Sequence, residues 1–226
     1  MVVPDTARLI AGVDDAGRGP VIGPLVIAGV AFKDDRISHL RSLGVKDSKL
    51  LRPSTRSRLA KQIVDSAESF AYVEVAPNEI DEAVSRGIRL RRLNFLEAKA
   101  MAEVIMKLRP TVAYVDASDV VAERFGRQIA ELLPKAISIV SEHHADAKYS
   151  IVGAASILAK VRRDQIIEQL SREYGDIGSG YTADPKTLKF LENWIRTRGD
   201  YPPIVRKSWK NLRRLEASIS QKKLEA

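Results

Sequence analysis

The sequence predicts an α/β fold in which a mixed five-stranded sheet is flanked by helices, with a helical extension at the C-terminus. Two observations predict it. A pair of apolar segments separated by a short Gly- and Pro-rich turn opens the chain, and strand-like and helix-like segments then alternate. An opening hairpin gives antiparallel pairing, whereas strands joined through helices run parallel, so one sheet is expected to contain both.

The strands are predicted from composition and from their boundaries. Each segment is rich in β-branched or alternating apolar residues and is bounded by Gly, Pro or polar residues. The turn AGRGP separates the first two segments. The expected strands cover residues 8–15, 21–32, 70–76, 111–118 and 135–144.

The helices are predicted from apolar periodicity and from start and stop signals such as Pro53 and Pro110. In one long segment Ile151, Ala154 and Leu158 recur at helical spacing, which indicates an amphipathic helix. We expect one domain over residues 1–200 and a basic helical extension over residues 201–226 packed on it. The expected helices cover residues 52–70, 78–87, 91–108, 120–133, 149–174, 186–197 and 207–223.

Composition narrows the function classes. The 226 residues carry a formal charge of +8, which favours a polyanionic partner, although many basic proteins bind no nucleic acid. There is no Cys, which excludes disulfides and cysteine-bound metals. No segment has the length and apolarity of a membrane span, and the first ten residues do not resemble a secretory signal. We therefore expect a cytoplasmic protein with no membrane partner, and a monomer because no exposed apolar stripe calls for a partner chain.

Acidic residues follow several of the predicted strands. Asp14 and Asp15 end the first strand, Asp116 lies at the end of the fourth, and Asp146 lies just beyond the fifth. A single Asp at a strand end is commonly a helix cap or a turn residue. Several acids gathered at one edge of a sheet repel one another unless a cation neutralises them, and Mg²⁺ prefers carboxylate oxygens. The pattern therefore predicts a shared metal site.

Asp14 and Asp15 raise a geometric question, because neighbours on a strand face opposite sides. Both can serve one site only where the strand ends and the backbone turns. The Gly-Arg-Gly sequence at Gly17, Arg18 and Gly19 makes such a turn possible.

Several blocks of the sequence together resemble the ribonuclease HII family in its archaeal form. They follow one another in order over nearly the whole chain, and the first and fifth are the most specific. The blocks are GVDDAGRGPVIGPLV, GVKDSKLL, LNFLEAKAMAEVI, YVDAS, HADAKYSIVGAASILAKVRRD, GSGYTADPKT and PPIVRKSWKNL.

The resemblance implies a ribonuclease-H-like fold for the main domain and an endonuclease that cleaves the RNA strand of RNA–DNA hybrids. It also implies cleavage 5′ of ribonucleotides embedded in duplex DNA, leaving 3′-hydroxyl and 5′-phosphate ends. Its catalytic and metal-binding acids correspond to Asp14, Asp15, Asp116 and Asp146, which would hold two Mg²⁺ or Mn²⁺ ions with Asp14 bridging them. The family usually has Glu where this chain has Asp15, so metal spacing or preference is open to change.

The resemblance also supplies substrate contacts. Glycines let the backbone approach a sugar closely, so Gly17, Arg18 and Gly19 are expected to read the 2′-hydroxyl that distinguishes RNA from DNA. Tyr181 would stack on the sugar at the junction with DNA; without the resemblance it would be a loop residue that caps the core.

Phosphate contacts are expected from basic and hydroxyl side chains. Charged faces are usually only solvated, and that alternative stays open for each of them. On the long helix Ser156, Lys160 and Arg163 share a predicted polar face. The expected substrate contacts outside the Gly-Arg-Gly turn and Tyr181 are Lys46, Ser48, Lys49, Asn94, Ser156, Lys160, Arg206, Lys207 and Lys210.

Two other functions fit parts of the sequence. The same acids could serve a nuclease or resolvase of this fold that acts on another DNA substrate, although the Gly-Arg-Gly turn and Tyr181 disfavour it. Alternatively the chain could be a binding module with a decayed site, which only Asp15 suggests.

Overall fold

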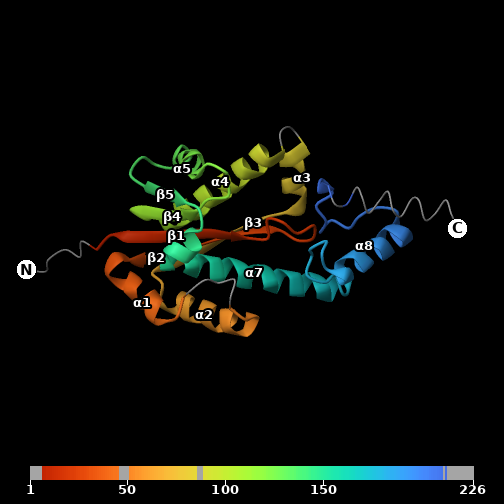
Figure 1. The fold of residues 1–226 in the computed structure, drawn as a ribbon, viewed down its shortest axis with the longest axis horizontal. Helices are drawn as coiled ribbons and strands as arrows, with labels where there is room; N and C mark the ends of the chain where they lie inside the picture. The colour runs from red at the N-terminus through yellow and green to blue at the C-terminus, as the bar shows by residue number, and fades with distance from the viewer. Residues whose placement is uncertain (1–6, 46–50, 86–88, 211, 213–226) are drawn as a thin grey trace, which may run out of the picture. The chain divides into compact units, whose positions relative to one another are not determined.

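The computed structural model describes residues 7–45, 51–85, 89–210 and 212. Figure 1 shows its elements in chain order. The strands are β1 (Leu9–Ala16), β2 (Leu25–Lys33), β3 (Ser69–Val75), β4 (Val112–Asp116) and β5 (Ser138–Glu142). The helices are α1 (Ile37–Ser42), α2 (Pro53–Ser66), α3 (Pro77–Ser85), α4 (Arg89–Leu108), α5 (Ala122–Ala130), α6 (Ala145–Lys148), α7 (Ser150–Tyr174) and α8 (Pro185–Arg198), with a 3₁₀ turn η1 (Asp34–Arg36) before α1.

The chain divides into two compact units that alternate along the sequence. The first unit takes in residues 1–16, 26–74 and 94–162, and it contains the sheet. The second unit takes in residues 17–25, 75–93 and 163–226. None of the helices in the described part of the chain combines the length and the apolar composition that a membrane crossing requires.

The first unit is built on a five-stranded sheet in the order β3-β2-β1-β4-β5. The strand β1 pairs antiparallel with β2, from Leu9 opposite Lys33 to Ala16 opposite Val26. On its other side β1 runs parallel to β4, and β4 runs parallel to β5. The predicted mixed sheet flanked by helices is confirmed. Its parallel strands β1, β4 and β5 end at the same edge of the sheet, and Asp14 and Asp116 lie at the ends of β1 and β4.

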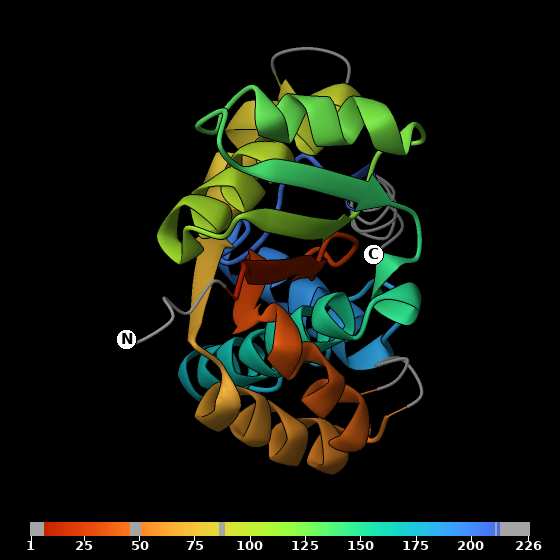
Figure 2. The same cartoon turned by 90° about the vertical axis from the view of Figure 1, so that its left-hand side faces the viewer.

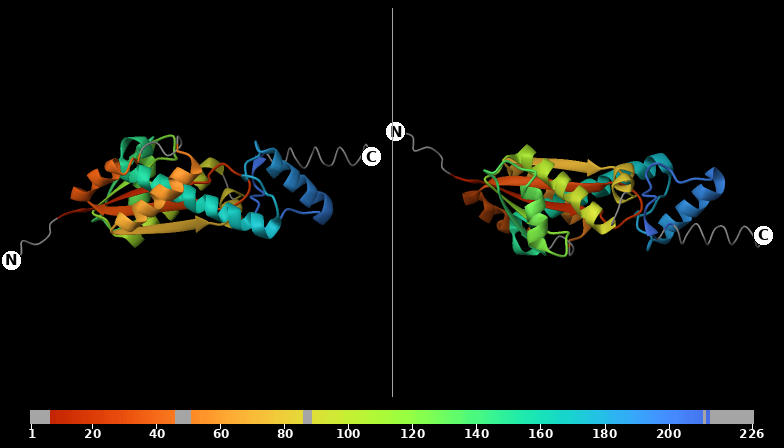
Figure 3. Two further views of the ribbon diagram at one scale, coloured as in Figure 1. Left: turned by 90° about the horizontal axis from the view of Figure 1, so that it is seen from below. Right: turned by 90° about the horizontal axis from the view of Figure 1, so that it is seen from above.

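Helices cover both faces of this sheet. In Figure 2, α4 and α5 lie on one face, and α1, α2 and the first part of α7 lie on the other; Figure 3 shows the same two layers from below and above. Gly12 of β1 allows the start of α7 to lie directly against the sheet. A Cβ at Gly12 would fall 2.2 Å from the carbonyl oxygen of Ile151. The absence of a side chain there brings the segment that carries Asp146 against the strand that carries Asp14.

The structure differs from the expectations at the ends of elements and in short helices. The second strand begins at Leu25 rather than at residue 21, because Gly23 takes a positive φ of 89° and Pro24 cannot donate to a strand ladder. The short helices α1 and α6 were not predicted, since four to six residues carry little periodicity. Most of the helix expected over residues 207–223 lies outside the described residues.

The position of the long helix α7 was predicted, but the burial of its first part was not. All residues from Ile151 to Ala159 are buried, so the first part of α7 has no solvated face. The prediction of an amphipathic helix is wrong there, because this part of α7 packs in one apolar cluster with the sheet, α2 and the start of α6. The expected polar face is wrong for Ser156, which has no exposed surface, and for Arg163, which is 8% exposed.

Candidate active site

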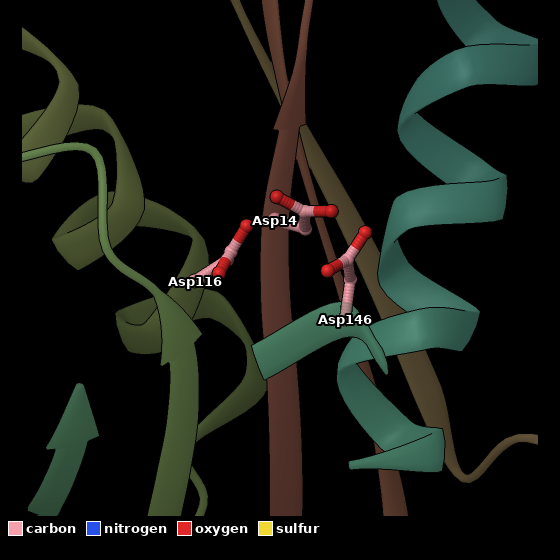
Figure 4. A group of neighbouring side chains, drawn as sticks. All are labelled: Asp14, Asp116 and Asp146. Carbon is pink, nitrogen blue, oxygen red and sulfur yellow. The ribbon is translucent and has the colours of Figure 1, made fainter. Parts of the chain in front are cut away.

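Three of the four predicted acids come together at the end of the parallel strands. Asp14 of β1, Asp116 of β4 and Asp146 of α6 each present a carboxylate oxygen, and these oxygens all lie within 4.8 Å of one another. Figure 4 shows the three side chains converging from separate elements. We call this group the carboxylate triad.

Strand register places the first two acids of the triad. In the parallel pairing of β1 with β4, Val13 lies opposite Val115, and Asp14 and Asp116 each follow that pair by one residue. The burial of Asp14 at 4% exposure follows from its place in a central strand. The carboxyl ends of parallel strands thus set the spacing of these two side chains.

The third acid is held by the turn after β5. His144 has a left-handed backbone with a φ of 56° and begins α6, which carries Asp146 on its first turn. The backbone N–H of Ala145 donates to Oδ1 of Asp116 across 2.8 Å. This hydrogen bond connects the end of β4 to the start of α6 and keeps Asp146 beside Asp116.

Asp15 stands apart from the carboxylate triad. The strand continues through Asp15 to Ala16, which still pairs with Val26, so both acids lie within the strand and the turn expected at the Gly-Arg-Gly sequence begins after it, at Gly17. Successive residues of a strand point to opposite faces, and Asp15 is not among the carboxylates grouped within 4.8 Å. Its backbone N–H donates to Oδ1 of Asp14 at 2.7 Å.

The carboxylate triad is electrostatically strained. Burial raises the pKa of Asp14 well above its usual value, and the neighbouring charges of Asp15 and Asp116 raise it further. Hydrogen bonds from the Ser156 side chain and the Asp15 backbone act in the opposite direction. A divalent cation fits this group, since all three side chains offer hard oxygen ligands and their carboxylates lie close together.

Ser156 and Lys160 support Asp14 from α7. The Nζ of Lys160 donates to Oγ of Ser156 at 2.7 Å, and the Ser156 side chain hydrogen-bonds Asp14. The Ser156 hydroxyl is therefore engaged inside the protein. The predicted phosphate contact is wrong for it, because such a contact requires a hydroxyl exposed to solvent. Lys160, which donates to Ser156, is itself partly exposed.

A buried polar network follows β4, and sequence reasoning missed most of it. The side-chain amide of Asn94 donates to Oδ2 of Asp119 at 2.8 Å, and the N–H of Val121 donates to Oδ1 at 2.9 Å. Arg124 completes the set with an ion pair to Asp119. Although burial alone raises the pKa of Asp119, the hydrogen bonds from Arg124, Val121 and Asn94 lower it to about 2.

Asn94 was expected to contact substrate, but its side chain is 7% exposed and engages Asp119. The neighbouring loop is held in a second place, where Ser118 Oγ donates to the buried carboxylate of Glu97. Asp119 accepts from the backbone N–H two residues further along, as Asp side chains commonly do in the turn before a helix.

The second unit holds the predicted sugar contacts. Gly17 has a φ of 90°, a left-handed conformation that only glycine adopts readily, so the backbone turns immediately after β1. A Cβ built on Gly19 would lie 3.6 Å from Cε1 of Tyr181. The segment Gly17–Gly19, which we call the glycine turn, therefore lies beside the Tyr181 ring.

Arg163 fixes the Tyr181 ring from one side. Its guanidinium carbon lies 5.0 Å from the ring centre, and its Nη2 donates to the carbonyl oxygen of Ser179 at 2.8 Å. Tyr181 remains 41% exposed. One side of the ring is thus held and the rest is accessible.

The basic residues of the C-terminal part differ in their surroundings. The expected phosphate contact is wrong for Arg206, which has no exposed surface and whose guanidinium donates to three backbone carbonyls inside the protein. Lys207 is exposed and pairs with Asp200 at 2.7 Å, and Lys210 is exposed. Lys46, Ser48 and Lys49 lie outside the described residues, as does the chain after residue 212.

Comparison with known proteins gives a consistent result. The family model described as Ribonuclease HII matches residues 11–212. A Ribonuclease HII from Pyrococcus furiosus is 47% identical over 216 residues, which cover 95% of this chain and 94% of the relative.

Two solved structures are similar in fold. The crystal structure of ribonuclease H2 from Pyrococcus horikoshii superposes with a TM-score of 0.85 at 44% identity, covering 94% of this chain and 99% of the other. A complex of PCNA with RNase HII from Archaeoglobus fulgidus gives a TM-score of 0.81 at 44% identity, covering 89% of this chain and 95% of the other.

Proposed function

The chain belongs to the ribonuclease HII family, endoribonucleases that act on RNA–DNA hybrids, and from that premise we propose that its carboxylate triad holds the catalytic divalent cations. The observation that carries the proposal is the convergence of Asp14, Asp116 and Asp146 within 4.8 Å. Such a group of carboxylates suits Mg²⁺ or Mn²⁺. When bound, a pair of these ions lowers the pKa of the attacking water and stabilises the leaving oxygen.

The protein's own residues prepare the site. Asp14 lies on β1, the central strand of the sheet, and would hold the ions together with Asp116 and Asp146. Ser156 orients the Asp14 carboxylate, and the N–H of Ala145 donates to Oδ1 of Asp116 and so holds that carboxylate in place. Asp15 is proposed as a fourth ligand on the strength of the family pattern alone, because its carboxylate lies outside the triad.

Substrate selection is assigned to the second unit. The glycine turn would read the 2′-hydroxyl of the ribonucleotide, and Tyr181 would stack on the adjoining sugar. Support comes from the bare backbone at Gly19 and from the exposed, laterally fixed ring of Tyr181. The exposed Lys207 and Lys210 are proposed to contact duplex phosphates. Cleavage 5′ of an embedded ribonucleotide would then leave 3′-hydroxyl and 5′-phosphate ends.

A direct test uses duplex DNA that carries one ribonucleotide, with an all-DNA duplex of the same sequence as control. We expect cleavage of the first duplex alone, dependent on Mg²⁺ or Mn²⁺, at the bond 5′ of the ribonucleotide. Equal cleavage of the all-DNA duplex would favour a resolvase-like nuclease. Binding of the ribonucleotide duplex without cleavage by the unsubstituted protein would contradict the proposed catalytic role of the triad.

A further inference from the structure

Arg206 is the largest side chain that is fully buried among the described residues. A buried guanidinium is costly unless its donors are satisfied. Here Nε donates to the carbonyl oxygen of Gly23 at 2.9 Å, Nη1 to that of Arg18 at 3.1 Å, and Nη2 to that of Gly17 at 2.6 Å. Two of these three acceptors belong to the glycine turn.

Trp209 holds the remaining residue of the glycine turn. Its Nε1 donates to the carbonyl oxygen of Gly19 at 3.0 Å. The Trp209 ring also packs against Arg206, whose guanidinium carbon lies 5.1 Å from the ring centre. The Arg206 backbone N–H donates to the carbonyl oxygen of Val21 at 2.8 Å, which anchors this segment to the chain just after the turn. Two side chains thus hold three consecutive carbonyl groups.

Because each peptide unit is planar, the direction of a carbonyl group also fixes the direction of the N–H group in the same unit. In a planar trans peptide the N–H points opposite to the carbonyl of the same unit, and the described chain has no cis peptide. The carbonyls of Gly17 and Arg18 point at Arg206, so the N–H groups of Arg18 and Gly19 point away from it. Pro20 has no N–H. Hydrogen bonds to a cation also polarise these peptides, which strengthens their N–H groups as donors.

We infer that Arg206 and Trp209 are positioning residues for ribose recognition. By fixing the carbonyls of the glycine turn they aim its N–H groups at the 2′-oxygen of the substrate, beside Tyr181. A turn built on Gly17 and Gly19 would otherwise sample many backbone conformations. The inference rests on the proposed function of the glycine turn and adds the residues on which its selectivity depends.

The experiment measures how strongly the protein prefers a ribonucleotide over a deoxyribonucleotide at one position of a duplex. Binding constants for the two duplexes are compared in an Asp14→Asn background, with and without Trp209→Phe. The Phe variant keeps an aromatic ring against Arg206 and loses the Nε1–H that donates to Gly19. We expect the preference to fall about fivefold, as for one lost hydrogen bond, while all-DNA binding changes less than about twofold.

The chain offers a matched control, because it contains only one other tryptophan. Trp194 lies on α8 in a cluster with Phe190 and Tyr174. Trp194→Phe should leave the preference unchanged, whatever it does to the melting temperature. Arg206→Lys is a second variant that keeps the charge but cannot reach three carbonyls in one fork, and it should reduce the preference more than Trp209→Phe.

The outcomes are distinguishable. If the parent prefers the ribonucleotide and Trp209→Phe keeps that preference, the positioning role is overturned and the proposed function stands. An equal loss of binding to both duplexes would also overturn it, since it would indicate only structural damage. If the parent itself shows no preference for the ribonucleotide, both the proposed recognition by the turn and the positioning role fail. Should Arg206→Lys not fold, Trp209→Phe alone decides.

Discussion

The backbone N–H of Ala145 donates to Oδ1 of Asp116 across 2.8 Å, and this contact joins the end of one strand to the helix that carries the next acid. It satisfies one carboxylate oxygen with a neutral donor, so it relieves only part of the repulsion among Asp14, Asp116 and Asp146. The remaining negative charge is what a divalent cation would neutralise.

Asp14→Asn separates catalysis from stability. We expect cleavage of a ribonucleotide-containing duplex to fall by at least about a thousandfold, or ~4 kcal/mol in activation free energy, because a central metal ligand is lost. The same variant should melt at a higher temperature in the presence of a chelator, because it removes a buried charge that Asp15 and Asp116 repel. Retained cleavage, or a lower melting temperature, would contradict this role for Asp14.

The pH dependence of stability follows from the raised pKa of Asp14. The Asp14 carboxyl of the folded, metal-free protein binds its proton more tightly than the same carboxyl does in the unfolded chain. The stabilisation is therefore complete below the unfolded pKa of 3.8 and is lost as the pH rises through the folded value. Urea denaturation in chelator from about pH 4 to about pH 8 should show Asp14→Asn gaining free energy of unfolding over the parent. A constant difference between the two proteins would count against a shifted pKa.

Asp119 should matter for stability rather than for the chemistry. Asp119→Ala leaves Asn94 without its carboxylate partner and Arg124 without its ion pair, which predicts a loss of about 2–4 kcal/mol in unfolding free energy. Asp65→Ala, at an exposed site on α2, is the control and should stay within about 0.5 kcal/mol. Denaturant titration measures both, and equal effects would show that the network contributes nothing.

Tyr181 offers a test of sugar stacking. Tyr181→Phe keeps the ring, so cleavage at a single embedded ribonucleotide should stay within about threefold of the parent, whereas Tyr181→Ala should reduce it by about tenfold or more. Cleavage of a continuous RNA–DNA hybrid should suffer less from the same change. Steady-state rates on the two substrates provide the comparison. An Ala variant with the parent's profile would remove Tyr181 from the recognition site.

The fold and the positions of the three converging acids are predictable from the sequence for a clear reason. Asp14 and Asp116 end parallel strands, and strand ends are visible as a change from β-branched to polar residues. The parallel arrangement then follows from the alternation of strands and helices, and it places these acids at one edge. Membership of the ribonuclease HII family, predicted from the sequence blocks, is confirmed by the family match over residues 11–212.

Other features depend on contacts that no local pattern records. Arg206 belongs by sequence to a run of basic residues, and nothing in that run distinguishes a buried guanidinium from solvated lysines. Ser156 has the spacing of a polar face, but its surroundings on α7 enclose it completely. Asp119 and Asn94 lie 25 residues apart and become partners only when α4 packs beside the loop after β4. In each case the tertiary environment, not the periodicity, decides the role.

The most direct test of the metal site is the anomalous scattering of crystals grown with Mn²⁺. We expect a peak bounded by the carboxylates of Asp14, Asp116 and Asp146, and its loss in Asp14→Asn crystals. A protein that cleaves its substrate while its Mn²⁺ peaks lie elsewhere, away from these three side chains, would contradict it.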